Sequence, residues 1–213
     1  MRWTVVRSIA ALTVIFLALA SHGMQAQTSL PYQKPPQAII DFIDTRPTPM
    51  VDVSPKDGSG SQWLLIESIS GLPSLADLAQ PELRLAGLRF NPRTNGPSRG
   101  RYITSLMLQA LPNGEAKPVS GIPPEARIRF AAWSPNARHI AFVNASDNPS
   151  DAGLSLWIID VASAQAHPVP GIALNGVFGR PCEWSSDNSS LICKTVPKNR
   201  GATPKRTEIP SAP

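Results

Sequence analysis

The sequence predicts an all-β fold built from repeated antiparallel units, and three observations support this class. Proline is frequent, at 23 of 213 residues, and proline is disfavoured inside helices and central strands. Charged residues make up only 16% of the chain, against about 25% in an average soluble domain. A pattern of tryptophan, turn and returning strand occurs at Trp133 and again at Trp184. Many short strands joined by turns explain all three.

The best-formed unit spans residues 124–171. Its sequence alternates through RIRFAAW, turns at Ser-Pro-Asn-Ala and returns through RHIAFVN. Pro168 fits only an outer edge strand, because it cannot donate to a central ladder. Four consecutive antiparallel strands that end on a weak outer edge form one β-propeller blade. We therefore expect strands at 127–133, 138–144, 154–161 and 165–169, with a turn at 134–137 and a polar loop at 145–153.

The same pattern recurs on both sides of this unit. Residues 183–192 follow the pattern of residues 132–141, and residues 52–65 form a looser copy. Self-similarity at about 40–50 residues indicates a propeller or a solenoid, and the hairpins favour the propeller. We predict a partial β-propeller of about three antiparallel four-stranded blades, the last one incomplete. Their expected bounds are 38–123, 124–171 and 172–196, and the first is expected to hold strands at 63–68 and 102–111 and a helical turn at 74–79.

The residues that define the blade pattern have predicted structural roles. Ile140 and Phe142 are expected on the same face as Trp133, because side chains alternate along a strand. The tryptophan ring buries a large apolar area at the end of an inner strand. The complete set of motif residues is Trp133, Ile140, Phe142, Trp157, Asp160, Trp184 and Leu191.

The N-terminal residues 1–26 are typical of a secretory signal peptide. Arg2 and Arg7 flank the start of an apolar run that ends in small residues, and cleavage is expected after Ala20 or Ala26. The run of 13 residues is shorter than the ~20 needed to span a bilayer, although an N-terminal membrane anchor is the alternative. We expect a periplasmic or secreted protein with no stable membrane insertion after cleavage. Residues 27–37 are predicted to be a linker, and residues 197–213 a disordered tail.

The charge pattern does not favour nucleic-acid binding. The formal net charge is +5, but the excess lies in the N-terminal segment and the C-terminal tail. No aromatic side chains are interleaved there to stack on bases.

The sequence shows no catalytic, cofactor or metal site. A nucleophile elbow requires Gly-x-Ser-x-Gly, and neither Gly58-Ser-Gly-Ser-Gln nor Gly153-Leu-Ser-Leu-Trp completes it. The three histidines at 22, 139 and 167 are expected on the surface. No short-spaced Cys/His cluster suits zinc, and the acidic loop at 147–151 lacks the glycine and terminal glutamate of an EF-hand.

Cys182 and Cys193 are predicted to lie directly opposite each other across a hairpin. The register that pairs Trp184 with Leu191 also pairs the two cysteines. An exported protein meets an oxidising compartment, so a cross-strand disulfide is one interpretation. Two reduced, buried thiols in the places that Ala131 and Phe142 occupy in the preceding unit are the other.

These blade sequences resemble the propellers of the prolyl oligopeptidase family of serine peptidases and the Tol-associated periplasmic propellers. The resemblance rests on WSPNARHIAF at 133–142 and LWIIDV at 156–161. A narrower resemblance, to the glutamyl endopeptidase subgroup, rests on PELRLAGLRFNP at 81–92, NGPSR at 95–99 and FIDTRPTP at 42–49. It implies a propeller that gates peptide access to a C-terminal α/β-hydrolase domain.

The resemblance, and the failure of the strings at Gly58 and Gly153 to complete an elbow, predict a non-catalytic propeller part, truncated before any catalytic domain. A peptide or protein substrate is then expected only if a catalytic domain is present. The alternative is a free-standing periplasmic interaction module. Because a closed ring needs at least four blades, about three would leave open sheet edges that can pair with another chain.

Overall fold

The computed structural model describes residues 33–146, 148 and 152–201. The predicted signal peptide, and most of the predicted linker and tail, lie outside these residues. The described chain consists mostly of antiparallel strands, which confirms the all-β class. None of its helices has the length and apolar character needed to cross a membrane.

The described residues form two helices and thirteen strands. The helices are α2 (Gln37–Ile43) and α3 (Leu75–Leu78). The strands are β1 (Met50–Val53), β2 (Trp63–Ile69), β3 (Leu83–Leu85), β4 (Leu88–Asn91), β5 (Gly96–Pro97), β6 (Ile103–Ala110), β7 (Ala116–Pro118), β8 (Ile128–Trp133), β9 (His139–Ser146), β10 (Gly153–Asp160), β11 (Gln165–Val169), β12 (Cys182–Trp184) and β13 (Leu191–Cys193).

The chain divides into two compact units, Met1–Ile43 and Asp44–Pro213. Helix α2 belongs to the first unit and begins at Gln37, the last residue of the predicted linker. Neither α2 nor the small sheet β3-β4-β5 was expected, because both come from short segments rich in flanking prolines. The short helical turn predicted at 74–79 is present as α3.

The second unit contains two antiparallel meanders and a hairpin. The first meander pairs β1-β2-β6-β7, and the segment between β2 and β6, residues 70–102, is an insertion that holds α3 and the β3-β4-β5 sheet. The second meander pairs β8-β9-β10-β11 in the predicted order, with Pro168 on the outer strand β11. The hairpin β12-β13 stands as a separate two-stranded sheet.

The two meanders are joined into one eight-stranded sheet rather than forming separate sheets. A single pair, Ile103 on β6 with Ile128 on β8, makes the join, and both side chains are buried. A second fastening lies near Gly121, whose φ is +79°. A Cβ there would lie 2.5 Å from the carbonyl oxygen of Ala166 on β11, so only glycine allows this approach.

The sequence repeat corresponds to a repeated turn. Ser54 and Ser134 are almost fully buried, and each hydroxyl accepts the backbone N–H of the residue that begins the returning strand. Buried hydroxyls need such partners, which explains the serine. In all three copies, the backbone N–H groups of Ser54, Ser134 and Ser185 donate to the carbonyl oxygens of Trp63, His139 and Ser190.

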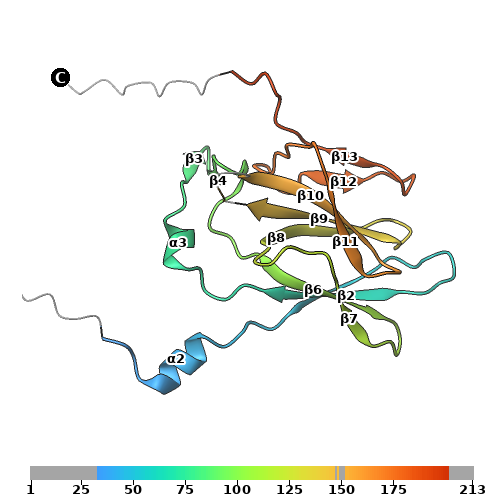
Figure 1. The fold of residues 1–213 in the computed structure, drawn as a ribbon, viewed down its shortest axis with the longest axis horizontal. Coiled ribbons are helices and arrows are strands. Elements are labelled where there is room, and N and C mark those ends of the chain that lie inside the picture. Colours follow the sequence, from blue (N-terminus) through green and yellow to red (C-terminus); the bar gives the residue numbers. More distant parts are fainter. Residues whose placement is uncertain (1–32, 147, 149–151, 202–213) are drawn as a thin grey trace, which may run out of the picture. The chain divides into compact units, whose positions relative to one another are not determined.

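Two hydrophobic clusters lie on opposite faces of the second meander. The first cluster fills the space toward the first meander and includes Ile140 and Phe142. The second fills the space toward the hairpin and includes Ala141 and Val143. Figure 1 shows the resulting stack, with β2 and β6 below, β8–β10 in the middle and β12-β13 above. Strand β9 is therefore apolar without interruption from Ile140 to Val143, because both of its faces are covered.

Replacing Phe142 with alanine tests the first cluster. Phe142 is fully buried, and its ring lies 6.0 Å from that of Trp157. We expect Phe142→Ala to lower the free energy of unfolding by about 3–5 kcal/mol, because it leaves a cavity. Ile192→Ala is the matched control, since that side chain is 73% exposed, and it should change stability by less than about 0.5 kcal/mol. Urea unfolding measures both, and equal effects would contradict the assignment.

Candidate functional site

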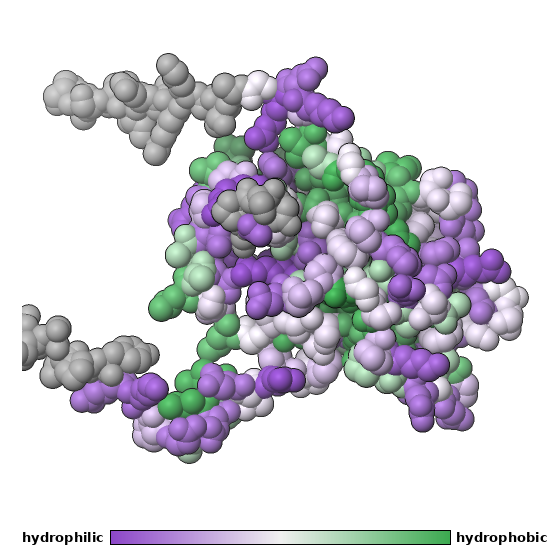
Figure 2. Space-filling view, viewed as in Figure 1, coloured by the Kyte–Doolittle hydropathy of each residue, from purple (hydrophilic) through white to green (hydrophobic). Residues whose placement is uncertain are grey.

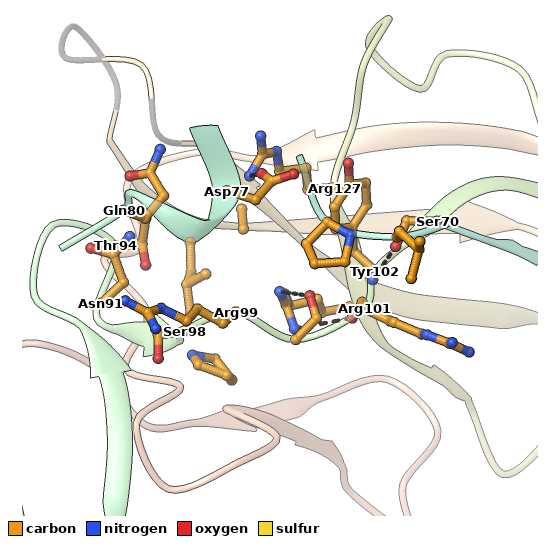
Figure 3. Close-up of a pocket in the computed structure, with 18 of the residues that line it drawn as sticks. Ser70, Asp77, Gln80, Asn91, Thr94, Ser98, Arg99, Arg101, Tyr102 and Arg127 are labelled. Atoms are coloured by element: carbon orange, nitrogen blue, oxygen red, sulfur yellow. Dashed lines mark hydrogen bonds and ion pairs between the residues drawn. The ribbon is translucent and has the colours of Figure 1, made fainter. Parts of the chain in front are cut away.

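The insertion and the start of β8 enclose a small pocket of about 70 Å³. Figure 3 shows its wall of charged and amide side chains. Four arginines and one carboxylate line it, together with Gln80 and Tyr102. The charged lining residues are Asp77, Arg99, Arg101, Arg127 and Arg129.

Helix α3 holds Asp77 in the pocket through a capping box. The hydroxyl of Ser74 accepts the backbone N–H of Asp77, and the Asp77 carboxylate accepts the backbone N–H of Ser74, both at 3.1 Å. These reciprocal bonds satisfy donors that a helix start would otherwise leave unpaired. The Ser-x-x-Asp spacing at 74–77 was the sequence signal for this arrangement.

Arg127 faces Asp77 across the pocket. Its Nη1 lies 2.7 Å from Oδ1 of Asp77, and its guanidinium lies 5.2 Å from the centre of the Tyr102 ring. Burial alone would raise the pKa of the Asp77 carboxyl. Hydrogen bonds from Ser74 and the positive charge of Arg127 outweigh burial, so that the pKa of Asp77 lies below its ordinary value. The pair is therefore ionised at neutral pH and ties α3 to the second meander.

Arg129 fastens the end of the insertion. Its guanidinium donates to the carbonyl oxygens of Gly100 at 2.8 Å and Arg101 at 3.2 Å. A Cβ at position 100 would come within 2.9 Å of Nη1 of Arg129, so a side chain there would displace the end of the arginine. The guanidinium of Arg129 thus holds the loop before β6 through hydrogen bonds to its main-chain carbonyl oxygens.

Glu82 organises the other side of the insertion. Its carboxylate accepts hydrogen bonds from Ser98 at 2.6 Å and Arg84 at 2.9 Å, and it lies 3.5 Å from Nε of Arg99. The bond from Ser98 and then that from Arg84 lower the pKa of Glu82. The segment that carries the resemblance to glutamyl endopeptidases therefore forms a cross-linked rim beside the pocket.

No described histidine lies beside the serines of the pocket. Ser70 and Ser98 line it, but the described histidines His139 and His167 lie on β9 and β11 and are absent from its lining. A serine nucleophile needs an adjacent base. No cluster of three potential metal ligands occurs within the described residues. The buried Oε1 of Gln80 receives no hydrogen bond from the described residues. The pocket wall therefore holds one hydrogen-bond acceptor without a partner among those residues.

The predicted blade residues lie outside this pocket, and all of them except Asp160 belong to or pack against the two hydrophobic clusters. Trp133 pairs with Ile140, and Trp184 pairs with Leu191, at equivalent positions of their hairpins. The indole N–H of Trp184 donates to the carbonyl oxygen of Ala132 at 3.0 Å, which links the hairpin to β8.

Trp157 and Asp160 lie on β10, as expected. The indole N–H of Trp157 donates to the hydroxyl of Ser155, and the ring stacks on Phe142. Asp160 accepts the backbone N–H of Ser163 at 2.8 Å, which closes the turn into β11. This bond and that from the Ser163 hydroxyl lower the pKa of Asp160.

Cys182 and Cys193 pair directly across the hairpin, with Cα atoms 4.1 Å apart, and are joined by a disulfide. Cys182 is buried in the second hydrophobic cluster. The bond links the two short strands at the end away from the turn.

Comparison with known proteins relates this chain to peptidases. A rice protein (Oryza sativa subsp. japonica) named probable glutamyl endopeptidase, chloroplastic, is 38% identical over 192 residues. The chain is peptidase-related. An Arabidopsis thaliana protein of the same name is 36% identical over 190 residues. Each match covers 85% of this chain, which spans about a fifth of the relatives' length, 20% and 19% respectively. No family model and no solved structure matches.

These similarities support the resemblance to glutamyl endopeptidases seen in the sequence. Pocket residues Asp77, Arg127 and Arg129 were not singled out there, because their meeting depends on how the insertion folds onto β8. The Ser-x-x-Asp spacing at the start of α3 is the one feature of the pocket that a local sequence pattern indicates.

Asp77→Asn tests the ion pair and its pH dependence. A carboxyl with a lowered folded-state pKa stabilises the protein above its unfolded pKa, and this contribution is lost as pH falls through the folded pKa. We expect the variant to be about 1–2 kcal/mol less stable at pH 7. The difference from wild type should shrink below about pH 4. Glu115→Gln, on an exposed turn, is the control, and a pH-independent difference in urea unfolding would contradict the assignment.

The double variant Cys182→Ser, Cys193→Ser tests the disulfide. Closing this loop should stabilise the folded chain by about 3 kcal/mol, mainly by restricting the unfolded state. The variant should unfold at lower urea concentration, and a reducing agent should produce the same shift in wild type but none in the variant. Mass spectrometry that finds two free thiols in protein purified without a reducing agent would refute the bond.

Proposed function

We propose that this chain is the non-catalytic propeller part of an exported serine peptidase of the glutamyl endopeptidase type. In such a protein the propeller would gate the access of peptides to an α/β-hydrolase domain. The observation that carries the proposal is the extent of the similarity. It covers 85% of this chain but about a fifth of relatives named as glutamyl endopeptidases.

The layered arrangement supports the propeller part of the proposal. The same serine turn begins three hairpins, and the layers pack face to face through two hydrophobic clusters. Propeller blades are four-stranded antiparallel sheets arranged around an axis. The second meander has the strand number and order of one blade, and the first meander and the hairpin would be its neighbours.

The chemistry of the described residues supports a role without catalysis in this chain itself. The Gly-x-Ser-x-Gly string at residues 96–100 runs from the short strand β5 into a loop rather than into a helix, which is not the strand-turn-helix context of a nucleophile elbow. No histidine lies beside Ser98 in the lining of the pocket. The gating role would belong to the assembled peptidase. Export rests on the signal peptide proposed for residues 1–26.

Serine-directed labelling tests whether the reactive serine lies outside this chain, in a hydrolase domain. A fluorophosphonate probe should leave the purified 213-residue chain unlabelled. It should label a polypeptide expressed from the same reading frame extended through a hydrolase domain. The matched control is the extended polypeptide with its elbow serine replaced by alanine, which should lose the label. Labelling of the 213-residue chain would refute the non-catalytic assignment, and a reading frame without a downstream hydrolase would refute the parent enzyme.

A free-standing interaction module predicts a different solution behaviour. Such a module would be monodisperse and would unfold in one cooperative transition when purified alone. Sedimentation and thermal unfolding of the exported chain therefore separate the two functions.

A further inference from the structure

A second, apolar groove runs along β13 over the exposed part of the second meander. Its volume is about 600 Å³. Leu156 and Ile158 of β10 and Val169 of β11 contribute to its lining, and Trp184 and Leu191 of the hairpin form another part. Figure 2 shows hydrophobic residues gathered over this region of β10–β13. The groove exists because the two-stranded hairpin covers only part of the face that the four-stranded meander presents.

The edge of β13 beside this groove has unpaired backbone groups. The N–H of Lys194 donates to the carbonyl oxygen of Pro181, on the β12 side. Backbone groups of successive residues point to alternate edges of a strand, so those of Leu191 and Cys193 point to the opposite edge. No described strand pairs with that edge. An unpaired edge is a template for another strand.

The second meander shows what occupies the equivalent position one repeat earlier. The shared serine turn makes Leu191 equivalent to Ile140 and Cys193 equivalent to Phe142. In the second meander, β10 pairs with this edge. The β10 residues opposite Ile140 and Phe142 are Ile159 and Trp157, respectively.

The side chains of these two β10 residues fill the space toward the preceding layer. Ile159 is fully buried in the first cluster, and Trp157 packs against that cluster. In the third repeat, the corresponding space is the apolar groove. Two large apolar side chains at alternate positions of an added strand would therefore point into it.

We propose that this groove binds an extended β-strand from outside residues 1–213, antiparallel to β13. The strand carries large apolar side chains at two alternate positions, opposite Leu191 and Cys193. Main-chain hydrogen bonds to the β13 edge supply affinity, and the two side chains over β10-β11 supply selectivity. This inference rests on the propeller part of the proposed function and not on peptidase activity.

Two other occupants fit less well. Residues 202–213, ATPKRTEIPSAP, contain three prolines and one large apolar residue, Ile209, and proline cannot sit in a central strand. A second copy paired through β13 would be related by a twofold axis perpendicular to the sheet. Both second meanders would then lie on the same face and compete for the same space.

A synthetic peptide with the sequence of residues 153–161, GLSLWIIDV, flanked by lysines for solubility, is the probe. The full chain with its disulfide intact should bind this peptide in isothermal titration calorimetry. Hydrogen exchange should show new protection at the amides of Leu191 and Cys193. A control peptide that is N-methylated at the position of Ile159 should bind at least about tenfold more weakly, because it cannot donate a hydrogen bond to the carbonyl oxygen of Leu191.

Matched protein variants locate the site. Ile172→Asp places a charge in the groove lining, outside the named strands, and should weaken peptide binding at least about tenfold. Ile192→Asp lies on the opposite, exposed face of β13 and should leave binding unchanged. Circular dichroism checks that both variants fold.

Three results would overturn the proposal. They are no peptide binding by the folded chain, protection only at other strand edges, and a peptide-independent dimer that protects β13. The assay does not use peptidase activity, so its failure would leave the peptidase relationship intact. Conversely, a serine-probe result against the parent enzyme would leave the strand site testable.

Discussion

The burial of β9 on both faces is the constraint on which the rest of this structure depends. A strand that is apolar from Ile140 to Val143 cannot face water on either side. Alternate residues of β9 point to opposite faces of the sheet, and each face must be covered by another layer. The first meander covers one face and the hairpin covers the other. Face-to-face stacking of sheets about 10 Å apart is the usual way to meet this requirement. The serine turns support this stacking locally, because they start each returning strand in the same register.

Polar contacts position the insertion against this apolar stack. Asp77 meets Arg127, and Arg129 holds the carbonyl oxygens of the loop that leads into β6. Partly buried charges are tolerated only when they are paired and hydrogen-bonded. The insertion also carries the residues that resemble glutamyl endopeptidases. Charged contacts thus help to fasten to the layers the insertion that carries this resemblance.

The incomplete cover of the second meander connects the fold with the proposed function. The hairpin protects the part of the face over β9 and leaves the part over β10 and β11 as an apolar groove. A lid that gates a catalytic domain would need this side closed by further strands. The same unpaired edge of β13 is both the place where a propeller would continue and a surface able to receive a strand.

The sequence by itself determined the all-β class, the strands of the second meander and the opposed cysteine register. These features follow from local alternation, turn residues and a period-two register, which one segment encodes alone. It did not predict α2, the β3-β4-β5 sheet or the pairing of Ile103 with Ile128 that merges the two meanders. Only the tertiary structure brought Asp77 to Arg127 and opened the groove beside β13, because contacts between distant segments depend on how the layers stack and no local pattern encodes them.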